Sequence, residues 1–283
     1  MLFRDVLNEA ITVLQNEKIS DAVNDAWLLA EHELSINHQK YYMDMNISID
    51  EAQREKYMRL VNERAKHIPL QHITGHQEFM GIDFIVNENV LIPRQDTELL
   101  VEKTLELIEK NKKKQTFKIL DMCTGSGCIA VSVKKFCEKK GIDVDVTASD
   151  ISEKALKTAR KNALNNETQI TFVHSDLFEK IEGKFDYILS NPPYIPTKVI
   201  EGLEREVKEH EPFGALDGHD DGLYFYRIIT KEAAERILPD GCIIYEIGYD
   251  QADEVSDMLR KKTSCVKVYK DLANNDRVVV AEF

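Results

Sequence analysis

Four consecutive residues, Asn191-Pro192-Pro193-Tyr194, carry the groups needed to hold a planar –NH2 group. They follow a run that predicts a strand over residues 185–190, so we expect them at the carboxyl edge of an α/β sheet, where such sheets bind ligands. Proline fixes φ and has no N–H, so each prolyl residue offers only a carbonyl acceptor. The Asn191 side-chain oxygen and the Pro192 carbonyl therefore match two N–H donors, and the Tyr194 ring can pack on the face of the group. A simple Asn-Pro turn between two elements is the alternative interpretation.

A glycine-rich loop forms a second candidate site. The predicted strand 117–122 is followed by the run Cys123-Thr124-Gly125-Ser126-Gly127, and together with Ala130 this run fits the pattern G-x-G-x-x-G/A. Glycines let the backbone approach a ligand closely, and the N-terminus of the helix predicted over 127–139 offers unbonded N–H groups. Asp150 ends the next predicted strand, where an acidic side chain binds a pair of ribose hydroxyls. The loop predicts an adenosine-containing ligand, and a tight turn without a ligand is the alternative.

The glycine loop alone does not decide the type of cofactor, because NAD and S-adenosylmethionine both satisfy its pattern. A third segment follows another predicted strand, and there Asp176 could accept from an adenine amino group while Leu177 or Phe178 could cover the ring. Asp176 would serve equally well as a helix cap. The Asn191–Tyr194 segment favours methyl transfer, since it supplies acceptors for an amine and no general acid for hydride chemistry.

The order of the predicted elements indicates an α/β fold with a mostly parallel sheet. Helical and strand patterns alternate, which places helices on both faces of such a sheet, and the last two strands suggest an antiparallel edge. We predict helices over 97–109, 127–139, 152–165, 223–237 and 251–260, and strands over 117–122, 144–149, 169–174, 185–190, 242–247, 266–270 and 277–283.

Helical spacing of apolar residues without any strand pattern predicts an N-terminal helical domain over residues 1–72. Ser20 and Asp50 are expected to cap its second and third helices. Residues 73–92 are assigned to a β-hairpin linker that turns at Gly81, and residues 93–283 to the catalytic domain.

The composition is that of a globular protein with an acidic surface. The chain has 283 residues, of which 43% are hydrophobic, and a formal charge of −13 from 50 acidic and 37 basic residues. Such a surface repels phosphate backbones and disfavours direct binding to nucleic acids. The one basic cluster, residues 110–114, is interpreted as a solvated connector. Because the sequence has neither a membrane-length apolar stretch nor a signal-peptide pattern, we expect a cytoplasmic protein.

The cysteines and histidines do not predict a disulfide framework or a metal site. The five cysteines are scattered and include no CxxC, which favours buried free thiols. His72 and His76 lie four residues apart, but Thr74 and Gly75 between them argue against a helix that would align the two rings.

Beyond these two sites, the chain resembles the HemK-type (PrmC family) glutamine methyltransferases that modify peptide-chain release factors. The resemblance rests on an ordered set of blocks from about residue 69 to the C-terminus, together with the helical N-terminal region. The blocks are residues 75–79, 90–98, 121–130, 190–194, 211–216 and 271–277. Asn-Pro-Pro-Tyr alone is shared with adenine-N6 methyltransferases, whereas the ordered set is specific.

This resemblance implies a class I, Rossmann-like methyltransferase fold, S-adenosylmethionine as donor, S-adenosylhomocysteine as product, and no metal. The implied reaction methylates the side-chain amide nitrogen (N5) of the glutamine in a release factor's Gly-Gly-Gln motif, with the N-terminal domain recognising that substrate. The implied cofactor-binding residues are Cys123, Thr124, Gly125, Ser126, Gly127, Asp150, Leu177 and Asn191, and the implied substrate-binding residues are Asn191, Pro192, Pro193 and Tyr194. Two residues depart from the family pattern: Cys123 stands where a first glycine is usual, and Gln95 where proline is common.

An amide nitrogen is a poor nucleophile, because its lone pair is delocalised into the carbonyl. We expect Asn191 Oδ1 and the Pro192 carbonyl to accept the two amide hydrogens and Tyr194 to pack on the amide plane, with no general base. Asp121 is expected either to face the donor's ammonium group or to be a buried structural acid. Arg94 is expected to pack near the cofactor or to form a structural ion pair. We expect Asp276 and Arg277 to hold the last hairpin together.

Three other functions are compatible with parts of the pattern. Methylation of adenine N6 would use the same clamp, but the acidic charge and the lack of an obvious target-recognition domain count against it. Methylation of a ribosomal-protein glutamine is disfavoured by the block over residues 92–97. A nonenzymatic sensor of adenosine nucleotides would not require the intact Asn191–Tyr194 segment.

Overall fold

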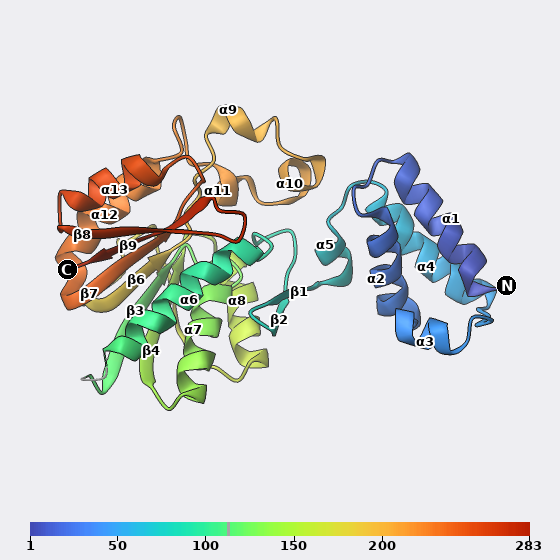
Figure 1. Ribbon diagram of the computed structural model, residues 1–283, viewed down its shortest axis with the longest axis horizontal. Coiled ribbons are helices and arrows are strands. Elements are labelled where there is room, and N and C mark those ends of the chain that lie inside the picture. Colours follow the sequence, from blue (N-terminus) through green and yellow to red (C-terminus); the bar gives the residue numbers. More distant parts are fainter. Residues whose placement is uncertain (112–113) are drawn as a thin grey trace. The chain divides into compact units, whose positions relative to one another are not determined.

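The computed structural model describes residues 1–111 and 114–283. They form two compact units, Met1–His76 with Glu204–His210, and Gln77–Leu203 with Glu211–Phe283. Figure 1 traces the chain through both. In the basic run expected to be a connector, Lys112 and Lys113 lie outside the described residues, while Lys114 forms an ion pair with Asp186.

The first unit is an all-helical bundle. Its helices are α1 (Phe3–Asn16), α2 (Ala22–Leu34), α3 (His38–Met43), α4 (Glu51–Arg64), α5 (Leu70–Thr74) and α10 (Arg205–His210). The predicted cap at Asp50 is confirmed, since its side chain accepts from the Gln53 backbone N–H in a capping box. The predicted cap at Ser20 is wrong, because α2 begins one residue later than a Ser20 cap requires and Asp21 holds the cap position.

A buried ion pair supports this helical bundle from within. Arg64 on α4 donates to Asp25 on α2 at 2.7 Å and pairs with Glu206 on α10 at 2.7 Å. Arg64 and Asp25 are both almost fully buried, and burial raises the pKa of Asp25 above its ordinary value while Arg64 opposes the rise. The segment Glu204–His210 therefore belongs with the helices of the N-terminal region, although it comes from the middle of the sequence.

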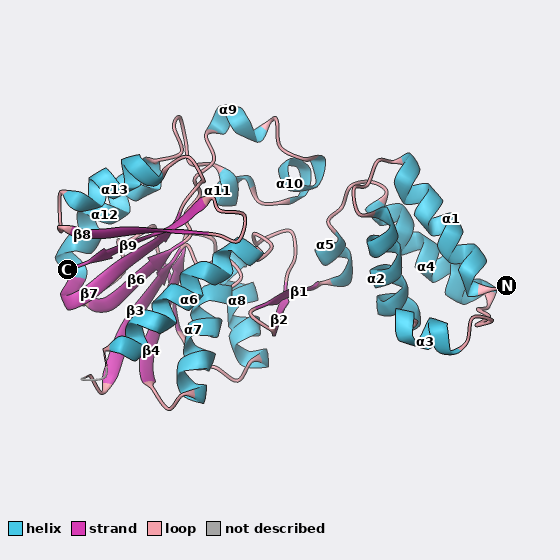
Figure 2. Cartoon of the chain, in the orientation of Figure 1, coloured by secondary structure: helices cyan, strands magenta, loops and turns pink. Residues whose placement is uncertain are grey.

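The second unit contains a two-stranded hairpin and a seven-stranded sheet. The hairpin strands are β1 (His76–Phe79) and β2 (Ile82–Ile85), and the turn between them places Met80 and Gly81 at positive φ, as a two-residue hairpin turn requires. The large sheet comprises β3 (Thr116–Met122), β4 (Asp143–Asp150), β5 (Thr171–His174), β6 (Phe185–Ser190), β7 (Ile237–Glu246), β8 (Cys265–Lys270) and β9 (Asp276–Glu282). Its strand order is β5-β4-β3-β6-β7-β9-β8; the pairs β7–β9 and β9–β8 are antiparallel, and the other pairs are parallel. The predicted mostly parallel sheet with an antiparallel edge is confirmed, and Figure 2 shows the strands in magenta.

Successive side chains of each strand point to opposite faces, so the large sheet has two apolar faces. Helices cover both of them. One face packs against α6 (Gln95–Lys110), α7 (Cys128–Lys139) and α8 (Glu153–Asn165), and the other against α12 (Tyr224–Arg236) and α13 (Ala252–Arg260). In β6, for example, Leu189 faces the first cluster and Ile188 the second.

The order of the sheet reverses between β3 and β6, which lie side by side at its centre. In open α/β sheets, ligands bind in the crevice at the carboxyl ends of such a pair, so the loops after β3 and β6 meet there. The long segment after β6 contains α9 (Thr197–Ile200), α10 and α11 (Phe213–Leu216), three short helices that the apolar spacing did not predict. None of the described helices is both long and apolar enough to cross a membrane.

Candidate active site

The loop after β3 is held in a conformation suited to close ligand approach. Gly125 and Gly127 both have positive φ, and a Cβ at Gly125 would meet no atom within 4 Å, so its backbone is open to a ligand. A Cβ at Gly127 would lie 3.0 Å from Ala159 Cβ, so this glycine permits close packing against α8. Cys123 also lies in the left-handed region, with φ of 61°, which a non-glycine residue can adopt at some strain. The residue at the usual glycine position thus adopts a backbone conformation that glycine favours.

Asp121, in β3, holds this loop through hydrogen bonds. Its Oδ2 accepts from Thr124 Oγ1 at 2.5 Å and from the Ala130 backbone N–H at 3.2 Å, so it ties the loop to the first turn of α7. The residue is fully buried, and its Oδ1 makes no hydrogen bond with any described residue. Asp121 is therefore a structural acid that keeps one acceptor oxygen unused. Burial raises its pKa to about 7.

This raised pKa predicts how stability depends on pH. The folded protein holds the Asp121 proton more tightly than the unfolded chain, whose pKa is near 3.8, so the contribution is full below about pH 4 and is lost as pH rises towards 7. We expect Asp121→Asn, which cannot ionise, to gain stability relative to the natural protein between pH 5 and pH 8 in the absence of ligand. Urea unfolding at both pH values measures this difference. The same pH dependence in both proteins would contradict it.

Asp150 ends β4, where the sequence placed a ribose-binding acid. Its Oδ2 accepts from the Gly125 N–H at 2.9 Å and its Oδ1 from the Ser152 N–H at 2.8 Å. Burial raises the pKa of this carboxyl, while the two backbone donors oppose the rise. The carboxylate is thus fixed beside the glycine loop, with further lone pairs able to accept from hydroxyl groups.

The segment after β5 differs in part from expectation. Leu177 is half-buried and lies in the left-handed region with φ of 42°, so it remains a candidate for contact with an adenine ring. Phe178 is not one, because its ring is buried in the core below α12 and faces Arg236. The alternative role of Asp176 as a helix cap is wrong, since Asp176 lies in a bend, residues 177–180 form turns and no helix begins there.

The Asn191–Tyr194 segment leaves β6 beside the glycine loop. Ser190 Oγ donates to the Met122 carbonyl at 2.8 Å, which joins the ends of β6 and β3. The Asn191 side-chain amide donates to Thr97 Oγ1 at 3.3 Å. Within residues 1–111 and 114–283, no donor bonds to Asn191 Oδ1 or to the Pro192 carbonyl. The segment therefore keeps two acceptors available next to each other in the chain.

Tyr194 is fixed by residues that the sequence patterns did not single out. Gln251 Nε2 donates to the Tyr194 carbonyl at 2.9 Å and to the Gly222 carbonyl at 3.3 Å. A Cβ on Gly222 would lie 2.2 Å from the Tyr194 oxygen, so only glycine fits there. The Tyr194 hydroxyl donates to Glu246 Oε1 at 3.4 Å, and burial beside this carboxyl raises the pKa of the phenol.

Three of the remaining family blocks, 90–98, 211–216 and 271–277, are held by ion pairs and hydrogen bonds. Arg94 Nη2 bonds to both carboxylate oxygens of Glu211, at 2.8 and 2.9 Å, which decides in favour of the structural ion pair. Residues 195 and 216–218 exchange backbone hydrogen bonds, so the block 211–216 runs beside the end of the clamp segment. The expected hairpin pairs are confirmed: Lys270 bonds to Asp276 at 2.7 Å and Arg277 to Asp271 at 3.1 Å.

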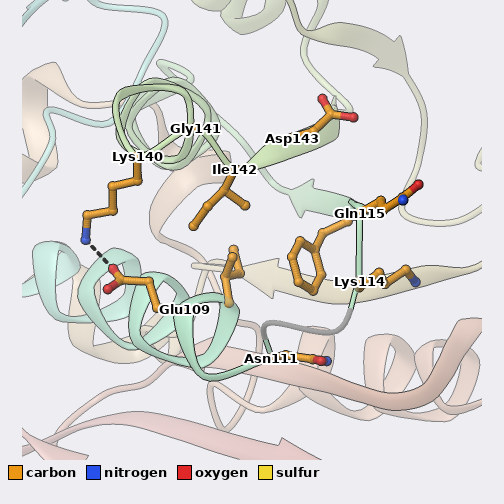
Figure 3. A pocket seen from close by; sticks show the side chains of 10 residues that line it. Glu109, Asn111, Lys114, Gln115, Lys140, Gly141, Ile142 and Asp143 are labelled. Atoms are coloured by element: carbon orange, nitrogen blue, oxygen red, sulfur yellow. Dashed lines mark hydrogen bonds and ion pairs between the residues drawn. The ribbon is translucent and has the colours of Figure 1, made fainter.

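A separate hollow lies at the opposite edge of the sheet. It has a volume of about 410 Å³ and is lined near the start of β3 by Phe117. Near the start of β4 it is lined by Asp143, which Figure 3 labels. Because the glycine loop and the Asn191 segment follow the carboxyl ends of their strands, this hollow is not part of their site. Among the described residues, no group of three or more His, Cys, Asp or Glu side chains is arranged to hold a metal ion.

Comparisons with known proteins agree with this geometry. The family model of the PrmC N-terminal domain matches residues 5–75, and that of the methyltransferase small domain matches residues 96–204. A release factor glutamine methyltransferase from Clostridium acetobutylicum is 41% identical over 287 residues, covering 99% of this chain and 98% of that protein. The chain belongs to the release factor glutamine methyltransferase family.

One further relative fits this family, and one solved structure fits the fold. The release factor glutamine methyltransferase of Clostridium botulinum is 38% identical over 99% of both chains. A solved methyltransferase from Pyrococcus furiosus, 18% identical, aligns with a TM-score of 0.51 over 72% of this chain and 90% of that chain, and this likeness concerns the fold alone.

Like its family, the chain is an S-adenosylmethionine-dependent methyltransferase. The residues after β3 and β4 fit that cofactor. The open Gly125 backbone and the fixed Asp150 carboxylate offer the approach and the acceptors that a ribose needs.

Proposed function

We propose that this methyltransferase modifies the side-chain amide nitrogen N5 of the glutamine in the Gly-Gly-Gln motif of peptide-chain release factors, and that Asn191 and Pro192 hold that amide. The observation that carries the proposal is the hydrogen bond from the Asn191 amide to Thr97 Oγ1. This bond occupies the donor side of the Asn191 side chain and leaves its Oδ1 as an acceptor. The Pro192 carbonyl is a second free acceptor, one peptide unit further along the chain.

In this arrangement S-adenosylmethionine supplies an electrophilic methyl group on its sulfonium. Asn191 Oδ1 and the Pro192 carbonyl accept the two hydrogens of the glutamine amide, which orients the nitrogen towards the methyl carbon. The same acceptors stabilise the positive charge that builds on nitrogen as the N–C bond forms and the S–C bond breaks. Orientation of this kind supplies about 7–11 kcal/mol in favourable models. Because the methylated, cationic amide readily loses a proton to water, no general base is needed.

The other predicted contacts belong to the same proposal. The run Cys123–Gly127, Asp150 and Leu177 bind the cofactor, which also touches Asn191. Tyr194 packs on the plane of the glutamine amide, while Pro193 is buried and its fixed φ shapes the segment. The predicted helical domain, residues 1–72, recognises the release factor, and the enzyme works in the cytoplasm on protein rather than on nucleic acid.

The proposal is tested by locating the transferred methyl group. The enzyme is incubated with methyl-labelled S-adenosylmethionine and a purified release factor, and separately with DNA and with ribosomal protein, and the label is located by mass spectrometry. A release factor whose Gly-Gly-Gln glutamine is replaced by alanine is the matched control. We expect label on that one glutamine and none on the control. Label on DNA or on a ribosomal protein, with the release factor unmodified, would overturn the proposal.

A further inference from the structure

A buried carboxylate outside the clamp segment lies next to it in space. Glu246 is the last residue of β7, the strand beside β6, and is 1% exposed. Its Oε1 accepts from the Tyr194 hydroxyl at 3.4 Å, and its Oε2 has no hydrogen bond with the described residues. A buried carboxylate with an unused oxygen is rare in a folded protein and calls for a physical reason.

Thr97 is the second buried residue behind the clamp. It lies in the first turn of α6, is 3% exposed, and accepts the Asn191 amide on its Oγ1. Its hydroxyl proton is not used in that bond. The Glu246 carboxyl lies nearby: burial raises its pKa to about 7, and the Thr97 hydroxyl opposes this rise.

We propose that Glu246 and Thr97 are positioning residues that fix which end of the Asn191 amide faces the substrate, an inference that rests on the proposed amide clamp. In its ionised form the Glu246 carboxyl can only accept, so it takes the Thr97 proton. The Thr97 oxygen must then accept from Asn191, and it accepts from the amide nitrogen. Asn191 Oδ1 is thereby left as the acceptor for the glutamine.

Charged neighbours keep Glu246 in place for this role. Burial raises the pKa of Glu246, and Arg277, which also pairs with Asp96 at 3.1 Å and with Asp271 at 3.1 Å, opposes this rise. Tyr194 donates to the same carboxylate, so Glu246 holds both the amide acceptor and the aromatic ring of the clamp. Neither Glu246 nor Thr97 contacts the reacting atoms in this scheme, because both act through the clamp residues.

The test compares Thr97→Val, which removes the hydroxyl at constant shape, with Thr97→Ser, which retains it. Release-factor methylation gives kcat and KM, and calorimetry gives the Kd for S-adenosylmethionine. We expect Thr97→Val to lower kcat by at least about tenfold, since small misplacements in an active site reduce rates by up to about a hundredfold. Thr97→Ser should stay within about threefold of the natural enzyme, and the Kd for S-adenosylmethionine should change by less than about twofold in both.

Glu246→Gln tests the proposal independently of the Thr97 variants. Glutamine keeps the shape, but its NH2 group can donate to Thr97 and reverse the direction of the bonds, so kcat should again fall by at least about fivefold. In the double variant with Thr97→Val, the loss of kcat should not exceed that of Thr97→Val alone by more than about twofold. Both changes interrupt the same chain of hydrogen bonds from Asn191 through Thr97 to Glu246.

Several outcomes would overturn the proposed role of Glu246 and Thr97. These are a kcat within about twofold of the natural enzyme for Thr97→Val or for Glu246→Gln, equal losses in Thr97→Val and Thr97→Ser, or multiplied losses in the double variant. If Thr97→Val does not fold, as judged by circular dichroism, Glu246→Gln alone decides. The failure of the proposed function is a separate result, since the natural enzyme itself would then leave the release factor unlabelled.

Discussion

Asn191→Ala is expected to lower kcat for release-factor methylation by about 10²–10³-fold, the effect of removing one preorganised polar group from a reacting centre. The variant loses the Oδ1 acceptor and also the bond to Thr97 that holds the side chain. The Kd for S-adenosylmethionine should rise much less, because the glycine loop and Asp150 are intact. Single-turnover methylation with labelled donor, paired with calorimetric titration of the donor, separates the two quantities.

Asn165→Ala is a matched control for this prediction, because Asn165 is an exposed residue at the end of α8 with no role in the site. It should methylate at the natural rate. Near-normal kcat in Asn191→Ala would show that the amide is held by other groups, and a large loss of donor binding would show that Asn191 serves the cofactor instead.

Gly222→Ala is expected to reduce both activity and stability. A Cβ at Gly222 would lie 2.2 Å from the Tyr194 oxygen and 2.6 Å from Gln251 Nε2, and the residue has φ of +75°. The backbone of Tyr194 must therefore move, which displaces the clamp, and the left-handed conformation adds strain. We expect kcat to fall by about a hundredfold, as for a misplacement of about 1 Å, and the free energy of unfolding to fall by about 2–3 kcal/mol.

Gly214→Ala is the control for the added methyl group. Gly214 lies in α11, has no positive φ, and a Cβ there would meet nothing within 4 Å. Its free energy of unfolding should stay within about 0.5 kcal/mol of that of the natural protein. Steady-state kinetics and urea unfolding check both variants. Natural activity in Gly222→Ala would mean that the position of Tyr194 does not matter for catalysis.

The site residues that come directly after a strand could be predicted from the sequence. Asn191 and Gly125 stand in short motifs, and alternation of strands and helices places both at the carboxyl edge of one sheet. The strand order confirms why they meet, since β3 and β6 are neighbours although they lie far apart along the chain. The capping box at Asp50 was predictable for a similar reason, because all its partners lie within four residues.

The residues that support the clamp could not be predicted in this way. Thr97, Glu246 and Gln251 come from α6, from β7 and from the residue before α13, and no local spacing relates them to Asn191. Gly222 has no motif around it, and its role depends on the distance to Tyr194. The short helices α9 and α11 were also missed, since helices of four residues are too short to show apolar periodicity.

The start of β7 shows a different limit. The strand begins at Ile237 rather than at the predicted Cys242, and it includes Pro239 and Gly241. Both residues normally indicate a turn or the end of a strand. Gly241 is required there because a Cβ would lie 2.7 Å from the Asp186 carbonyl of the neighbouring strand. This close approach between strands is a property of the folded sheet and leaves no local sequence signal.

The central claim is that Asn191 and Pro192 hold a glutamine amide for methylation. The most direct measurement is a crystal structure of the enzyme with S-adenosylhomocysteine and a release factor bearing an unmodified Gly-Gly-Gln motif. The account predicts that the glutamine side-chain nitrogen lies about 2.7–3.2 Å from both Asn191 Oδ1 and the Pro192 oxygen. A glutamine bound with that nitrogen turned away from both acceptors would contradict the account.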